Sequence, residues 1–173
     1  MTLRPWLRKL ALLAHVVASV GWLGAVIVFL VLAVVGLVSH DEMTVRGVYL
    51  VMERAAYFCL LPLAWATLAT GLVSSLGTPW GLFRHYWIIV KLGITVFATA
   101  ILLLYLHTFR AMAAVAANPA ADLSSIRNPS PLVHATLALL ILGVACVLAI
   151  YKPRGMTRYG WRRARGAGGK PEG

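Results

Sequence analysis

Three histidines, His15, His107 and His134, lie inside long apolar stretches of the sequence. An ionisable side chain in hydrocarbon costs on the order of several kcal/mol unless it pairs, faces the interior of a helical bundle or reaches the interface. A neutral imidazole is also a ligand for haem iron and for copper. These three residues are therefore the first candidates for chemistry, and helix packing is the alternative role of each.

The first histidine belongs to an inner polar stripe, which we define as His15, Ser19 and Trp22. In the stretch LLAHVVASVGWLGAVIVF, Ser19 and Trp22 lie about 40° and about 20° from His15 around a helix with about 100° per residue. Lys91 lies five residues inside a later apolar run, just as His15 does in the first run. We therefore expect Lys91 near this stripe. The stripe either lines a small binding site or fixes helix packing while Lys91 reaches the interface.

The other two histidines form a candidate outer site. If successive helices alternate in direction, His107 and His134 lie at similar depth in the opposite half of the membrane and can face each other. Two imidazoles from neighbouring helices can ligate b-type haem or copper, and four-helix bundles host such cofactors. Tyr57 and Arg54 would surround the cofactor, with Arg54 pairing with a haem propionate or, more simply, with Glu53. No CxxC, CxxCH or HExxH motif supports covalent haem, structural zinc or a zinc protease.

Four apolar runs must position these side chains, and they cover residues 10–38, 48–76, 86–109 and 132–151. The 173 residues are 61% hydrophobic and 12% charged, with a mean hydropathy of +0.84, which is too apolar for a soluble domain of this size. A transmembrane helix needs about 20 apolar residues and satisfies its own backbone hydrogen bonds in lipid. The sequence therefore predicts an all-α fold of four transmembrane helices in an antiparallel bundle.

The basic residues predict the orientation of the chain, whose formal net charge is +11. Lys and Arg flanking membrane helices mark the cytoplasmic side, and they gather in residues 1–9, at Arg84 and in residues 152–173. We therefore expect a basic cytoplasmic N-terminus (1–9), a transmembrane domain (10–151) and a basic, flexible cytoplasmic tail (152–173). The expected partner of the tail is the anionic headgroups of the bilayer rather than nucleic acid, with a second copy or another membrane protein as the alternative.

Two features of the second run concern its shape and packing. Pro62 cannot donate a backbone hydrogen bond to Phe58 and clashes with that turn, so a kink is expected there. Small residues recur every three or four positions at Thr67, Gly71 and Ser75, which favours close approach of a neighbouring helix.

Three stretches also carry a resemblance: HVVASVGWLGAVIVF, ATGLVSSLGTPWGLFRHYWIIVKLGIT and YKPRGMTRYGWR. Together they resemble a family of small bacterial four-span integral membrane proteins of unknown function. The His, Trp and Gly of the first stretch, and the Thr-Gly pair followed by Lys91 and Leu92, are more distantly similar to the copper-resistance D type of membrane protein. The first resemblance implies a bacterial cytoplasmic membrane, and the second implies copper handling.

Two functions from different classes are therefore open. The first is a non-enzymatic structural or accessory bundle whose polar groups specify packing. The second is a bundle that handles haem or copper through His107 and His134. We take the first as the working hypothesis, since ionisable residues in small bundles more often serve packing than cofactor binding.

Overall fold

A computed structural model describes residues 4–77, 81–153 and 155–167, and every regular element within them is helical. Four segments are long and apolar enough to cross a membrane, as predicted. The elements, in chain order, are α1 (Pro5–Val38), α2 (Glu42–Ala55), η1 (Ala56–Leu60), α3 (Leu61–Leu76), α4 (Tyr86–Ala117), η2 (Leu123–Ser125), α5 (Ser130–Tyr151) and α6 (Arg158–Ala167).

The helices extend beyond the apolar runs read from the sequence. The first begins at Pro5 rather than residue 10, with proline at a position where its missing N–H is tolerated. The second begins at Glu42 because the Asp41 carboxylate accepts the Thr44 N–H at 2.9 Å and so caps the helix. Hydrogen bonds from the Thr44 hydroxyl and N–H also lower the pKa of Asp41.

The irregularity expected at Pro62 takes the form of a π-helical turn, η1, directly before α3. The Leu61 N–H bonds to the Ala56 carbonyl, five residues back instead of four. The turn therefore holds one extra residue, and this wider turn accommodates the loss of the hydrogen bond that proline cannot make. The second membrane segment is therefore continuous from α2 through η1 to α3.

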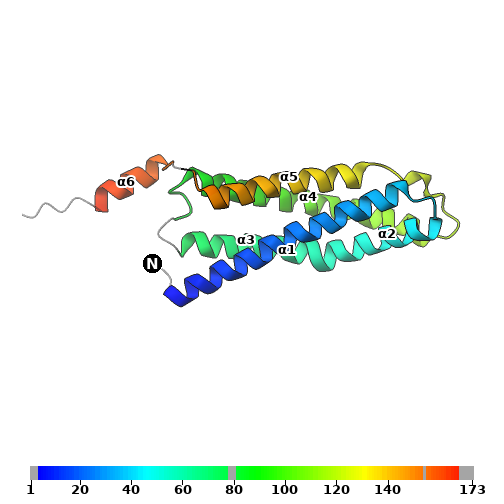
Figure 1. Cartoon of the computed structure of the whole chain (residues 1–173), viewed down its shortest axis with the longest axis horizontal. Helices are drawn as coiled ribbons and strands as arrows, with labels where there is room; N and C mark the ends of the chain where they lie inside the picture. Colours follow the sequence, from blue (N-terminus) through cyan, green and yellow to red (C-terminus); the bar gives the residue numbers. More distant parts are fainter. Residues whose placement is uncertain (1–3, 78–80, 154, 168–173) are drawn as a thin grey trace, which may run out of the picture.

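The long helices lie side by side, with α1 in contact with α2, α3 and α5, and α4 in contact with α2, α3 and α5 (Figure 1). Trp22, Phe29, Leu60 and Phe109 belong to the buried core between them. Large apolar side chains also cover the outside; Phe58, for example, is 77% exposed. An apolar exterior of this extent suits a lipid environment.

One end of the bundle is tied together by Arg46 and Tyr49 of α2. The Arg46 guanidinium donates to four carbonyls at the end of α4 and just beyond it, at 2.6 to 3.2 Å; these belong to Ala116, Asn118, Pro119 and Ala121. The Tyr49 hydroxyl donates to the Ile126 carbonyl at 2.7 Å. Since the last carbonyls of a helix lack partners within it, Arg46 both satisfies α4 and neutralises its negative end.

The other end holds the start of α1, the turn before α4 and the segment after α5 (Figure 1). Thr157 donates its hydroxyl to the Phe83 carbonyl at 2.6 Å and its N–H to the Arg84 carbonyl at 2.9 Å. It also accepts the Gly160 N–H at 3.0 Å, which caps α6. The tail predicted to be flexible therefore contains a helix, while its last residues, 168–173, lie outside the described part of the chain.

Candidate functional site

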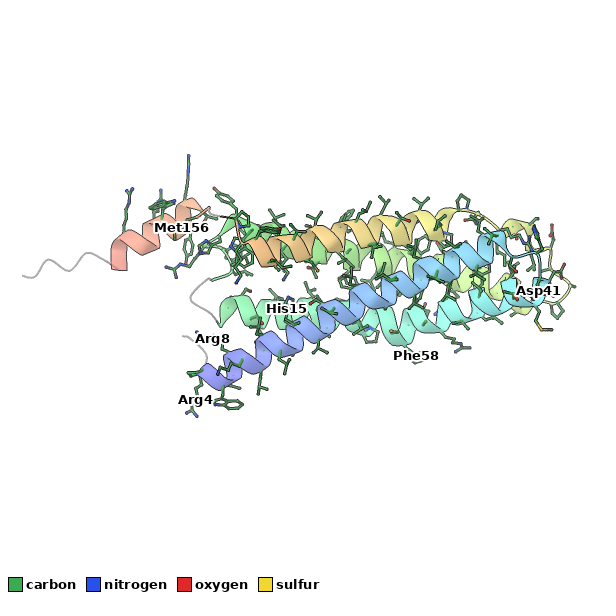
Figure 2. All side chains as sticks on the ribbon, viewed as in Figure 1. Arg4, Arg8, His15, Asp41, Phe58 and Met156 are labelled. Carbon is green, nitrogen blue, oxygen red and sulfur yellow. The ribbon has the colours of Figure 1, made fainter. Side chains whose placement is uncertain are left out.

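His15 joins three helices through its two ring nitrogens. It is 9% exposed on α1, on the stretch nearer Arg4 and Arg8 than Asp41 (Figure 2). Its Nδ1 lies 3.2 Å from both the Thr67 carbonyl and the Thr70 hydroxyl of α3. Its Nε2 lies 3.1 Å from Lys91 Nζ of α4. The structure thus brings together His15 and Lys91, which the sequence placed at the same depth.

The partners of the imidazole determine its tautomer. A carbonyl only accepts hydrogen bonds, so Nδ1 carries the proton that it shares between the Thr67 carbonyl and the Thr70 hydroxyl. The Thr70 hydroxyl donates in turn to the Ala66 carbonyl and keeps a lone pair for His15. Nε2 is then an acceptor and receives a hydrogen bond from Lys91. These four interactions fit a neutral imidazole beside a donating ammonium.

A glycine in α3 makes room for this ring. A methyl group built on Gly71 would lie 3.1 Å from His15 Cε1, closer than side chains normally approach. Gly71 follows Thr67 by four residues and Thr70 by one, so the residues that bond to the imidazole and the one that accommodates it belong to a single turn. The small-residue face of this helix is therefore the docking face for His15.

The other members of the predicted stripe take different roles. Ser19 donates to the Val16 carbonyl of its own helix at 3.1 Å, so it is not a partner of His15. Trp22 is 3% exposed and lies in the apolar core. The partners of His15 come instead from α3, which spacing along the first helix could not reveal, and from Lys91 of α4, which the sequence predicts near the stripe.

Two further hydroxyl groups complete what we call the inner polar cluster: His15, Thr67, Thr70, Ser74 and Lys91. Thr67 Oγ1 and Ser74 Oγ are buried and have no hydrogen-bond partner among the described residues. The two lie seven residues apart, which places them on nearly the same side of α3, with Gly71 between them. The sequence predicts Thr67 and Gly71 as packing residues, and the polar role of Thr67 depends on the side chains that face it.

The predicted outer pair is arranged differently from the expectation. His134 stacks on Tyr105 of α4 with ring centroids 4.1 Å apart, and its Nδ1 donates to the Ser130 carbonyl at 2.9 Å. His107 is exposed and lies two residues after Tyr105, about 200° around α4. The two imidazoles therefore do not face each other, because the rotation of α4 turns Tyr105 toward α5 and His107 away from it.

The remaining outer residues also have separate partners. Arg54 is exposed and pairs with Glu53 at 3.4 Å, the simpler of the two expectations for it. The ring of Tyr57 lies under the guanidinium of Arg110, with the centroid 5.5 Å from Cζ. The residues predicted to surround a cofactor thus stand in distinct local environments.

An apolar cavity of about 70 Å³ lies near His134, lined in part by Trp22, Phe29, Tyr105 and Ala138. A cavity of roughly 150 Å³ holds a benzene molecule, and haem is several times larger. This arrangement therefore does not fit a haem held by the two histidines. Among the described residues, no group of three or more His, Cys, Asp or Glu side chains is placed to hold a metal ion.

Replacing Gly71 with Ala should disrupt the contact between His15 and Lys91, because the new methyl group displaces the imidazole. Gly93→Ala is the matched control, since a methyl group there meets nothing within 4 Å. We expect Gly71→Ala to be less stable in detergent than Gly93→Ala by about 1–3 kcal/mol, measured by thermal unfolding. The ¹⁵N resonances of the His15 ring should shift in Gly71→Ala alone. Equal stability and an unchanged ring spectrum would contradict this role of Gly71.

Comparisons with known proteins do not assign a family. A scan against protein-family models gave no match, and searches of curated proteins and of solved structures gave none either. The resemblance to four-span bacterial proteins and to the copper-resistance D type therefore stays a prediction.

Proposed function

We propose that this protein is a non-enzymatic accessory bundle of the bacterial cytoplasmic membrane, in which the inner polar cluster fixes how the helices pack. The observation that carries the proposal is the set of hydrogen bonds from the His15 ring to α3 and to Lys91 of α4. Leu, Val and Ala side chains alone define helix orientation weakly in lipid, because lipid tails are equally apolar. A buried imidazole with fixed partners selects one rotation and one depth for each helix.

We further propose an antiparallel bundle with both termini in the cytoplasm. Arg4, Arg8 and Lys9 precede or begin the first span, and Arg84 lies in the turn before α4. The segment after α5 adds Lys152 and the arginines of α6. At the other end, residues 39–46 hold Asp41 and Glu42 with Arg46, and residues 110–127 hold Asp122 with Arg110 and Arg127, which gives little net charge. This asymmetry supports the orientation because the excess of Lys and Arg lies on one side.

The basic segment after α5 is proposed to lie on anionic headgroups. Helix α6 carries Arg158, Arg162 and Arg165 together with Tyr159 and Trp161, which are 51% and 54% exposed. Basic side chains attract anionic lipids, and amphipathic rings favour the headgroup region. Because Thr157 holds the start of α6 against the turn before α4, this helix begins at the end of the bundle where the basic residues gather.

The choice between an accessory bundle and a cofactor-bearing one is tested by absorbance and metal analysis of protein expressed with haem and copper supplied. We expect folded protein without a Soret band and without stoichiometric copper, since His107 and His134 do not converge. His15→Ala should lower the unfolding temperature, whereas His107→Ala should not, because His107 is exposed. A Soret band or bound copper that His134→Ala removes would refute the accessory proposal.

The orientation is tested with reporter fusions. A reporter that is active only in the cytoplasm, fused after Gly173, should be active, and the same reporter inserted after Ala120 should be silent. A reporter that is active only outside the cytoplasm should give the reverse pattern. Activity of the external reporter after Gly173 would overturn the orientation.

Lipid binding by α6 is tested by quenching of Trp161 with brominated lipids in proteoliposomes, taken as the difference between the parent and Trp161→Phe. Quenching should be stronger when phosphatidylglycerol is present than in phosphatidylcholine alone, because the arginines of α6 draw the helix to anionic lipid. Replacing Arg158, Arg162 and Arg165 with Gln should remove that difference. Equal quenching in both lipids for the parent protein would argue against the proposal.

A further inference from the structure

Among the described residues, the inner polar cluster contains a hydrogen-bond donor that has no acceptor, the Thr67 hydroxyl. Thr70, Thr95 and Thr99 each donate their hydroxyl to the carbonyl four residues earlier, as threonines in membrane helices commonly do. The Thr67 hydroxyl makes no such bond, although the residue is only 4% exposed. Leaving a buried hydroxyl unpaired costs about 1–3 kcal/mol, so this position favours a bound group that accepts.

Lys91 adds a positive charge that the neighbouring described residues do not balance. Its side chain is half-buried and donates to His15 at 3.1 Å, so it turns into the bundle. The sequence has no Asp or Glu between Glu53 and Asp122. Both of those residues lie toward the end of the bundle that Arg46 ties together. His15 is neutral in the tautomer described above, so it does not balance this charge.

The charge of Lys91 and the free hydrogen-bond donors at this site therefore both favour an anion as the ligand. An ammonium has three hydrogens, of which one is directed to His15, so further donors remain on Lys91. Hydrogen bonds between a cation and an anion are about twice as strong as neutral ones, and more so in a medium of low dielectric constant. An anion would compensate the ammonium and also accept from the Thr67 hydroxyl.

We propose that the inner polar cluster binds a small anion of the halide or short-chain carboxylate class, held by Lys91 Nζ and the Thr67 hydroxyl. Ser74 lies about 10 Å further along α3 than Thr67, toward the end of the helix at Leu76. Its hydroxyl is buried and has no partner among the described residues, so it can donate a hydrogen bond to an anion that passes between that end and the site. The anion therefore enters from the end of the bundle that holds Arg84 and α6. This binding activity goes beyond a purely structural role for the cluster.

The test is a thermal-unfolding titration of the full chain in uncharged maltoside detergent. Sodium formate is the probe, and sodium gluconate, a much bulkier anion, keeps the ionic strength constant. Formate should raise the unfolding temperature along a saturable curve, and chloride should compete with it. Equal stabilisation by formate and gluconate would overturn the proposal, as would stabilisation by phosphatidylglycerol with none by formate.

Two pairs of variants locate the effect. Thr67→Val keeps the shape of the side chain and removes the unpaired donor, so formate should bind about tenfold more weakly. Thr136→Val is its control, because the Thr136 hydroxyl already donates to the Leu132 carbonyl at 2.8 Å on α5. Lys91→Met should abolish the saturable effect, and Lys9→Met, which removes an exposed cation, should leave it unchanged.

The Thr67→Val variant tests the anion site even where Lys91→Met does not fold. Without formate, it should be at least as stable as the parent, since it removes an unsatisfied group. With saturating formate, the parent should become the more stable of the two. An unchanged formate midpoint in Thr67→Val would refute the assigned site. That result would leave the packing role of His15 intact, so the two proposals fail separately.

Discussion

The imidazole of His15 constrains the arrangement of three helices because each of its nitrogens has a partner on a different element. Nδ1 is fixed by a carbonyl and a hydroxyl of α3, and Nε2 by the ammonium of Lys91 on α4. Rotating α1 by one residue, about 100°, would move the ring out of reach of both. The Gly71 surface against which the ring packs would then face an apolar side chain. The depth and rotation of α1, α3 and α4 are thus set together by one side chain.

The ends of the bundle are held by a different kind of interaction. Arg46 bonds to carbonyls at and beyond the end of α4, and Thr157 bonds to carbonyls before its start. At the end of α4 a side chain from another segment satisfies carbonyls that the helix leaves unpaired, and at its start the Gly155 carbonyl accepts the Tyr86 N–H at 3.4 Å. These contacts fix where α4 begins and ends, whereas the His15 contacts fix which face it presents. Both are needed, because an apolar helix in lipid is otherwise free to slide and rotate.

Sequence reasoning located the four apolar segments and the shared depth of His15 and Lys91, since length and position along a helix follow directly from counting residues. It did not locate the partners of His15 on α3, because Thr67 and Thr70 are unremarkable until the helix that faces them is known. The outer pair illustrates the same limit: His107 and His134 have suitable chemistry, but a displacement of two residues from Tyr105 puts His107 on the far side of α4. Rotation about the helix axis is set by packing, and a single sequence carries only indirect information about it.

The hydrogen bonds within the inner polar cluster separate the groups that packing requires from those that it does not. A histidine that only fixed packing would need its ring nitrogens satisfied, and α3 and Lys91 already do this. The Thr67 hydroxyl, which has no partner among the described residues, does not contribute to the hydrogen bonds of His15. Because it is buried, it lowers the stability of the fold. A valine at the same position would fill the same volume without the cost. Packing therefore accounts for the imidazole, for Gly71 and for one hydrogen of the ammonium, whereas its other hydrogens and the Thr67 hydroxyl are accounted for by an acceptor of negative charge. The cluster thus combines a fixed scaffold with donors that it does not use itself, which is the arrangement expected of a binding site built on rigid helices.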